Sequence, residues 1–174
     1  ADRVVVEISS FQLDTIETFR PKVAALLNIS PDHLDRYAGL PDYAASKARI
    51  FENQTSKGAA ILNGNDPWTA QFVDKICAKK LYFDGRRPSA QGADIETDKL
   101  VLHFEGRDVQ SVDVSKFKLV GRHNLENASA ACLAALAAGA TLQAVESVLE
   151  SFEGLAHRVQ YAGSIEGVDF FDDS

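Results

Sequence analysis

The sequence has no methionine, only two cysteines, and no apolar run that approaches the length of a membrane-crossing helix. Cys77 and Cys132 stand far apart, and neither belongs to a metal-binding spacing. Two isolated thiols fit a reducing compartment better than a disulfide scaffold, so a cytoplasmic location is predicted. A membrane helix needs about 20 apolar residues, so no membrane association is predicted.

Several sequence motifs are also missing. There is no G-x-x-x-x-G-K-[ST] phosphate loop and no G-x-S-x-G elbow of a serine hydrolase. The formal net charge of −7 argues against nonspecific binding of nucleic acid. The chain lacks an initiating methionine and stops at "VDFFDDS", directly after an expected strand. We interpret it as an internal fragment of a longer protein, with a processed mature chain as the alternative.

The hydrophobic pattern predicts an α/β fold. Strands are expected at residues 4–8, 23–30, 59–63 and 80–84, and helices at residues 41–53 and 67–78 between them. This alternation is typical of a mostly parallel sheet flanked by helices. Residues 86–98 look like a loop, and "KLVLHFEGRDVQSVDVS" alternates as a small antiparallel hairpin.

The second half of the chain is expected to be helical until a domain boundary near Gly154. The alanine-rich stretch after "GRHN" is a strong helix former that Gly139 should end, and Thr141 can cap the helix that follows. "YAGSIEGVDFFDDS" then predicts a hairpin that begins another unit. The expected domains are residues 1–153 and residues 154–174.

Polar residues follow two of the expected parallel strands. Glu7 ends the first strand, and Asp32, His33 and Asp35 lie just past the second. In open parallel sheets, ligands bind beyond the carboxyl ends of the strands. Oxygen ligands with an occasional histidine suit magnesium or manganese. The alternative is that Glu7 caps a helix and that His33 is a hydrogen-bonded loop histidine.

Lys47 is expected on the apolar face of its helix, because it lies four residues after Tyr43 and four before Phe51. A desolvated lysine has a lowered pKa. Its neutral amine could act as a nucleophile or add carbon dioxide to form a carbamate, an anion that could bind a cation. The alternative is a side chain that passes the aromatic rings to reach water.

Two further sets of residues could bind a nucleotide. Asn124 and Asn127 share a face in the first turns of the alanine-rich helix, where amides can cap the helix or recognise a base edge. Arg158 suits a phosphate or a stacked ring. Asp173 could accept hydrogen bonds from ribose hydroxyls. Each of the last two alone is more often a surface charge.

The motifs "EISSFQLD", "LLNISPDHLDRY", "YAASKARIF", "GRHNLENASAA", "GLAHR" and "VDFFDDS", in this order, resemble the Mur ligases, the ATP-dependent amide ligases of peptidoglycan biosynthesis. The resemblance covers nearly the whole chain. "SSFQLD" is most similar to the member that adds D-glutamate to UDP-N-acetylmuramoyl-L-alanine. Folylpolyglutamate synthetases share the helix lysine but lack this run. The implied fold is most of the central ATP-binding domain with the start of the C-terminal domain.

The resemblance implies roles for the residues singled out above. Glu7 and His33 would bind Mg²⁺, and Lys47 would be the carbamylated lysine that helps to position the metal and the acyl phosphate. Ser9 and Gln12 would face the UDP-muramoyl substrate. The residues implied to contact ATP are Asn124, Asn127, Arg158 and Asp173.

The implied reaction passes through an acyl phosphate, which the amine of D-glutamate attacks. A monomer without nucleic-acid partners is expected, in a pathway that serves cell-wall biogenesis, cell shape and division. Other hypotheses are another Mur or folylpolyglutamate-type ligase, and a noncatalytic nucleotide-binding domain. The family's phosphate loop precedes the first motif and its tail continues past "DDS", so an isolated fragment is expected to be inactive.

Overall fold

The computed structural model describes residues 3–32, 35–84, 91–106, 108–119 and 121–174. In chain order the elements are α1 Ser10–Leu13, β1 Val23–Leu26, α2 Leu40–Ala48, η1 Arg49–Phe51, β2 Ala59–Asn63, α3 Pro67–Phe72, η2 Val73–Lys75, β3 Lys79–Phe83, β4 Gly92–Ile95, β5 Lys99–His103, β6 Gln110–Asp113, α4 Arg122–Ala137, α5 Leu142–Ser151, β7 Gln160–Ile165 and β8 Val168–Asp172.

The first six strands form one sheet in the order β1-β2-β3-β4-β5-β6. Strands β1 to β4 pair in parallel, and β5 and β6 extend the sheet in antiparallel pairing. Helix α2 connects β1 to β2, and α3 connects β2 to β3. The predicted α/β class, with a mostly parallel sheet and an antiparallel hairpin, is therefore confirmed.

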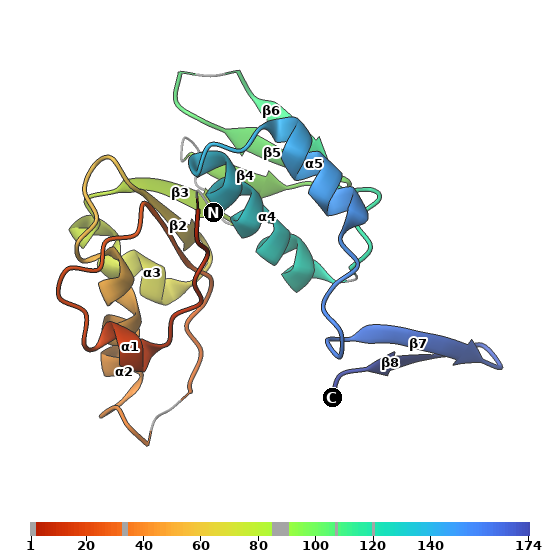
Figure 1. Ribbon diagram of the computed structural model, residues 1–174, viewed down its shortest axis with the longest axis horizontal. Helices are drawn as coiled ribbons and strands as arrows, with labels where there is room; N and C mark the ends of the chain where they lie inside the picture. Colours follow the sequence, from red (N-terminus) through yellow and green to blue (C-terminus); the bar gives the residue numbers. More distant parts are fainter. Residues whose placement is uncertain (1–2, 33–34, 85–90, 107, 120) are drawn as a thin grey trace.

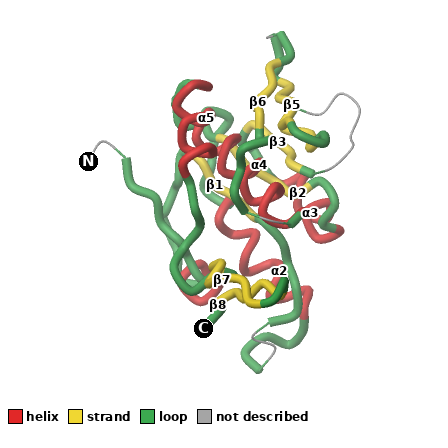
Figure 2. Tube along the Cα trace, turned by 90° about the vertical axis from the view of Figure 1, so that its right-hand side faces the viewer, coloured by secondary structure: helices red, strands yellow, loops and turns green. Residues whose placement is uncertain are grey.

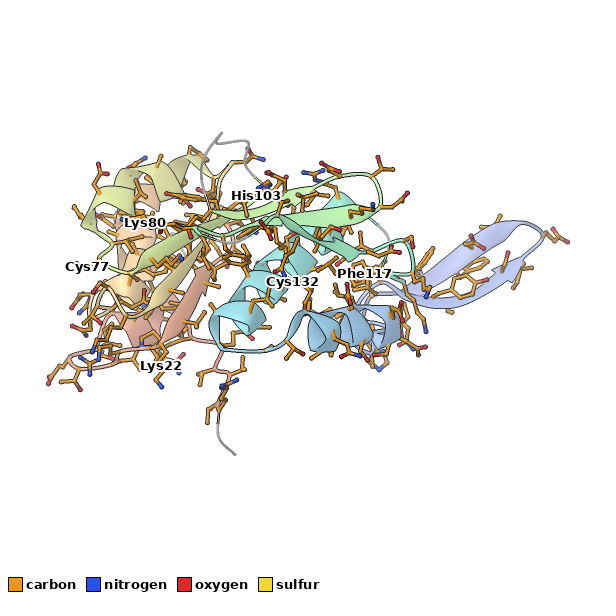
Figure 3. The ribbon with its side chains drawn as sticks, turned by 90° about the horizontal axis from the view of Figure 1, so that it is seen from above. Lys22, Cys77, Lys80, His103, Phe117 and Cys132 are labelled. Atoms are coloured by element: carbon orange, nitrogen blue, oxygen red, sulfur yellow. The ribbon has the colours of Figure 1, made fainter. Side chains whose placement is uncertain are left out.

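Helices cover both faces of the sheet (Figure 1). The residues of β2 alternate between the two hydrophobic cores that these helices cover. Ala59 and Ile61 point to the core that α4 and α5 cover, and Ala60 and Leu62 point to the core beneath α2 and α3. This alternation follows from the two-residue period of a strand. Burial on both faces explains the continuous apolar run in this strand. Cys132, on α4, belongs to the first core, and burial raises the pKa of its thiol to about 12 (Figure 3).

The two helix-end signals that the sequence predicted, at Thr141 and Gly139, are confirmed. Thr141 caps α5, with its hydroxyl oxygen accepting a hydrogen bond from the amide of Ala144. Gly139 follows the end of α4 with φ +91°, a conformation that glycine adopts without strain. The predicted helix at 67–78 is shorter, because α3 ends at Phe72 and only the η2 turn follows it. The predicted strand at 23–30 ends at Leu26.

The predicted strand at residues 4–8 is wrong. Val4, Val5 and Val6 are 79%, 99% and 61% exposed, and Figure 2 draws the chain near its N-terminus as a loop outside the strands. Apolar composition alone does not make a strand, because each strand needs a neighbour for its backbone hydrogen bonds. Within the described residues, β1 ends the sheet and pairs only with β2.

The expected loop at residues 86–98 contains a strand that the sequence pattern did not predict. Gly92–Ile95 forms β4, which pairs with β3 on one side and β5 on the other. Glycine and aspartate in this stretch suggested a loop. Its strand character comes instead from pairing with two neighbours, which local composition does not encode.

The second antiparallel hairpin, β7 with β8, forms a separate two-stranded sheet that extends away from the body of the protein (Figures 1 and 3). Residues 152–159 connect it to α5. Its large apolar side chains, including Tyr161, Phe170 and Phe171, are exposed. Among the residues that the structure describes, no helix is long and apolar enough to cross a membrane.

Gly92 is expected to be intolerant of a side chain. A Cβ atom there would lie 1.8 Å from the carbonyl oxygen of Tyr82 on the paired strand, and its φ is +155°. Gly106 has φ +69° in the turn between β5 and β6, but nothing lies within 4 Å of its Cβ position. Both substitutions to alanine impose backbone strain, and only Gly92→Ala adds a clash with main chain. Gly92→Ala should therefore lower the free energy of unfolding by about 1–3 kcal/mol more than Gly106→Ala. Urea denaturation of both variants checks this, and equal losses would contradict it.

Candidate functional site

The loops that follow β1 and β2 are hydrogen-bonded to each other at the carboxyl edge of the parallel strands. The Asn63 side chain donates to the carbonyl of Leu27 at 3.0 Å, and the Asp66 carboxylate accepts from the amide of Ile29 at 2.7 Å. Asp66 also caps α3 by accepting from the amide of Trp68. One side chain therefore fixes both the start of a helix and the path of the neighbouring loop.

The same edge continues to β3 and α4 through a polar cluster. Asp84, directly after β3, has φ +47° and a side chain that is 10% exposed. It accepts from the side chains of Arg122 and Asn65. Glu126, one turn further along α4, pairs with Arg122 at 3.4 Å. This Asp84–Arg122–Glu126 cluster ties the end of β3 to the first turns of α4.

The pKa values of the two carboxyl groups of the cluster shift in opposite directions. Burial raises the pKa of Asp84, but hydrogen bonds with Glu126, Arg122 and Asn65 outweigh burial and leave it below its usual value. Burial and the hydrogen bond with Asp84 together raise the pKa of Glu126. Two adjacent acids that share a proton show this divergence, because ionising both would place like charges side by side.

Ser9 and Gln12, predicted to face a substrate, form the start of α1. The Ser9 hydroxyl accepts from the amide of Gln12, and Gln12 Oε1 accepts from the amide of Ser9 at 2.9 Å. This reciprocal pair is a capping box, which satisfies two backbone donors of the helix. Glu7 is exposed and lies before the cap. Glu7 neither ends a strand nor caps α1, so the strand-end prediction and the helix-cap alternative are both wrong.

Lys47 lies on a helix, as expected, and is half-buried, but the helix predicted for residues 41–53 ends at Ala48, so Lys47 is in the last turn of α2. Its Nζ atom lies 5.2 Å from the centre of the Tyr43 ring, one helical turn earlier. The predicted proximity to the aromatic residue is confirmed, and the ammonium group lies over the ring face, an arrangement that stabilises a cation. His33, the proposed partner of Lys47 and Glu7, lies outside the described residues.

The helix that was predicted to carry Asn124 and Asn127 is confirmed as α4. Its N-cap is Gly121, so neither asparagine occupies the capping position. Asn124 is half-buried and Asn127 is exposed. Both lie in the first turns of the helix, beside the Asp84–Arg122–Glu126 cluster.

Arg158 and Asp173 lie at the open end of the β7–β8 hairpin, where Arg158 precedes β7 and Asp173 follows β8. Asp173 Oδ1 accepts from the amide of Val159 at 3.1 Å, and the neighbouring His157 contacts Asp172 at 2.7 Å. The imidazole hydrogen bond is the leading cause that lowers the pKa of Asp172. The predicted nucleotide residues of this region are therefore exposed and close to each other along the hairpin base.

Within the described part of the chain, no three His, Cys, Asp or Glu side chains come together as a metal site. The carboxylate of Glu7 has the hard oxygen chemistry that Mg²⁺ prefers. The sequence pattern did not predict the Asp84–Arg122–Glu126 cluster or the hydrogen bonds that Asp14 accepts from Ser46 and Tyr37. Asp84 had a detectable signal, since it is an acid at the end of an expected strand, as Glu7 was thought to be.

The chain belongs to the Mur ligase family, because residues 1–135 match the Mur ligase middle domain. It is 45% identical over all 174 residues to the UDP-N-acetylmuramoylalanine–D-glutamate ligase of Desulfosudis oleivorans, of which it covers 38%. The enzyme of the same name from Desulfatibacillum aliphaticivorans is also 45% identical, with 39% of its length covered. The chain therefore spans about two fifths of the length of these curated relatives.

Solved structures show the same fold. The chain resembles MurF from Acinetobacter baumannii with a TM-score of 0.70 and 26% identity, covering 88% of this chain and 34% of that one. It also resembles the UDP-N-acetylmuramate–alanine ligase MurC from Thermotoga maritima, with a TM-score of 0.65 and 20% identity over 95% of this chain and 36% of that one. The predicted family and the predicted fold are both confirmed.

The opposite pKa shifts of Asp84 and Glu126 predict how the stability of the protein depends on pH. The raised pKa of Glu126 means that the folded state favours its protonated form. Its contribution to stability is therefore present below the ordinary value of 4.5 and is lost as the pH rises through the raised value. Glu126→Gln mimics the protonated acid, so its melting temperature should increase relative to the wild type between about pH 4 and pH 7.

Glu153→Gln is the matched control with the opposite sign. The hydrogen bond from Lys118 lowers the pKa of Glu153, so the folded state favours its ionised form. This control should lose melting temperature relative to the wild type as the pH rises through the ordinary value of 4.5, and the difference should then stay constant. If the melting temperature of Glu126→Gln relative to the wild type stays constant or falls as the pH rises, the raised pKa of Glu126 is contradicted.

Proposed function

We propose that the full-length protein carrying this chain is an ATP-dependent amide ligase that adds D-glutamate to UDP-N-acetylmuramoyl-L-alanine. Membership of the Mur ligase family supports the reaction class. The single observation that carries the choice of substrates is the 45% identity, over the whole chain, to relatives named for this ligation. In this proposal the protein acts in peptidoglycan biosynthesis, as a monomer in the cytoplasm.

The reaction needs an activated acid, because a carboxylate is a poor electrophile. A carboxylate oxygen of the L-alanyl group attacks the γ-phosphorus of ATP, and the P–O bond to ADP breaks. The amine of D-glutamate then attacks the carbonyl carbon of the acyl phosphate. The C–O bond to phosphate breaks, the amine loses a proton, and the products are the amide and inorganic phosphate. The protein contributes by holding the partners in line and by stabilising charge on the transferring group.

The α1 segment is the proposed contact for the UDP-muramoyl substrate. The capping box occupies only Oε1 of the Gln12 amide. Its Nε2 group therefore keeps the donors that could bind a substrate oxygen. The cap also fixes the Gln12 side chain against the start of the helix. This arrangement presents an amide donor that has little rotational freedom left to lose on binding.

Glu7, His33 and Lys47, the last as its carbamate, are the proposed ligands for magnesium. Bound Mg²⁺ would neutralise charge on the phosphates. Lys47 lies over the Tyr43 ring. Conversion of its ammonium to a carbamate would end this cation–π contact and leave an anion beside the ring. We therefore propose that the carbamate is retained only when a cation binds it.

Asn124, Asn127, Arg158 and Asp173 are the proposed contacts for ATP. The asparagines project from the first turns of α4, where backbone N–H groups and amides can recognise a base edge. Arg158 and Asp173 lie on the β7–β8 side of residue 154, the boundary that we propose between a catalytic unit, residues 1–153, and the start of a second domain, residues 154–174. The separate two-stranded sheet of β7 and β8 supports this division.

The proposal is tested by phosphate release from the full-length protein with ATP, Mg²⁺ and UDP-N-acetylmuramoyl-L-alanine. D-glutamate, L-lysine and meso-diaminopimelate are added in parallel. Release that depends on D-glutamate alone is the expected result. Release with another acceptor would overturn the assigned step. No release with any acceptor, from a folded protein, would favour a noncatalytic nucleotide-binding role.

The Lys47→Ala variant tests the role of one residue in the same assay, with Lys57→Ala as its control. It should abolish D-glutamate-dependent release, because the proposed carbamate cannot form. Lys57→Ala removes an exposed lysine that follows α2 and η1, and should leave release unchanged. Near-normal turnover in Lys47→Ala would rule out the proposed role of this lysine.

A further inference from the structure

The Asp14 carboxylate joins the end of α1 to α2 and to the segment before α2 through two hydroxyl groups. Ser46 Oγ donates to Asp14 Oδ1 at 2.5 Å, and the Tyr37 hydroxyl donates to Asp14 Oδ2 at 2.8 Å. Ser46 is 5% exposed. Its oxygen also lies 3.0 Å from the carbonyl of Ser10, in α1. A hydroxyl has one proton, and the shorter contact to the charged oxygen is the stronger of the two.

Arg49 reinforces this connection from the turn that follows α2. Its guanidinium donates to the carbonyl of Asp14 at 2.7 Å and to the carbonyl of Ile16 at 3.0 Å. Asp14 is the C-cap of α1. The end of α1 is therefore held by Ser46 and Arg49, which lie three residues apart and so share one side of this helical segment.

An aromatic contact runs beside these hydrogen bonds. The rings of Phe11 and Tyr37 are stacked with 6.2 Å between their centroids, and the Arg36 guanidinium lies 4.4 Å from the Phe11 centroid. Tyr37 also contacts Tyr43 at 5.4 Å between centroids. Tyr37 thus connects a ring of α1 to the aromatic residue over which Lys47 lies.

Helix α1 depends on this junction for its orientation. It has only four residues, Ser10–Leu13. A helix this short has too few internal hydrogen bonds to be stable by itself. The residue pair that holds it lies next to both groups of the proposed site, since Asp14 is two residues after Gln12 and Ser46 directly precedes Lys47. The hydrogen bond from Ser46 to Asp14 therefore links the segment that carries the Ser9–Gln12 cap to the helix that carries Lys47.

We propose that Asp14 and Ser46 are positioning residues for the ligation, holding the Ser9–Gln12 cap and Lys47 at a fixed separation. This inference rests on the proposed function. Neither side chain needs to touch a substrate. A catalytic group must be held within a fraction of an ångström, and support from neighbouring hydrogen bonds supplies that precision. In the proposed reaction, the muramoyl contacts on α1 and Lys47 on α2 act on the same substrate, so their separation affects the chemical step.

The test uses Ser46→Ala and Asp14→Ala in the full-length ligase, assayed by D-glutamate-dependent phosphate release. Each should lower kcat by roughly 10- to 100-fold, the effect of a displacement near 1 Å. The KM for UDP-N-acetylmuramoyl-L-alanine should rise, and the KM for ATP should stay unchanged. The double variant should lose no more than Asp14→Ala alone, because Asp14→Ala already removes the hydrogen bond from Ser46.

Ser129→Ala is the matched control. Ser129 is also a buried serine, but its hydroxyl donates to the carbonyl of Leu125 within its own helix. Its loss should leave kcat and both KM values unchanged. Ser46→Thr retains the hydroxyl and should recover much of the lost kcat. Tyr37→Phe keeps the stacked ring and removes one bond to Asp14, so it should show a smaller kcat loss even if the alanine variants fold poorly.

The outcomes separate this inference from the proposed function. A wild-type protein without D-glutamate-dependent release would refute the function itself. An active wild type with Ser46→Ala and Tyr37→Phe kinetics equal to those of Ser129→Ala would overturn the positioning role. A loss of active enzyme in proportion to a lower melting temperature, with kcat per folded molecule unchanged, would also overturn it.

Discussion

Hydrogen bonds at the carboxyl edge of the sheet connect the segments that directly follow β1, β2 and β3. Asp66 holds the loop after β1, Asn63 reaches the same loop, and Asn65 reaches Asp84 after β3. Asp84 in turn binds Arg122 at the start of α4. Parallel strands leave their carboxyl ends side by side, and these bonds convert that proximity into one connected edge. Displacing one loop would therefore move the others.

Two different kinds of support surround the proposed site. Helix α4 begins at a polar cluster in which the pKa of Asp84 is lowered and the pKa of Glu126 is raised, and the charge-assisted hydrogen bond from Arg122 to Asp84 anchors its first turn to the sheet. Helix α1 is instead anchored to α2 by the hydrogen bond between Asp14 and Ser46, and to the segment before α2 by the stacked rings of Phe11 and Tyr37. The asparagines proposed to contact ATP lie on α4, beside the polar cluster. The proposed muramoyl contacts and Lys47 lie on the α1 and α2 segments that Asp14 and Ser46 hold together.

The sequence predicted those features that local patterns determine. Strand Ala59–Asn63 follows from a continuous apolar run, and the Thr141 cap follows from side-chain chemistry. Strand β4 was missed and a strand at residues 4–8 was wrongly expected, because strands exist only where neighbours pair with them. The aromatic neighbour of Lys47 followed from a four-residue spacing, whereas the Ser46–Asp14 bond joins residues 32 positions apart and left no local signal.

Transfer of oxygen from the acid to phosphate tests the central claim most directly. UDP-N-acetylmuramoyl-L-alanine labelled with ¹⁸O in its carboxylate would be incubated with the full-length protein, ATP, Mg²⁺ and D-glutamate, and the released phosphate analysed by mass spectrometry. An acyl-phosphate ligase breaks the C–O bond when the amine attacks, so each amide formed should deliver one labelled oxygen to phosphate. Unlabelled phosphate accompanying amide formation would contradict this route, and labelled phosphate without an amide product would contradict the ligation.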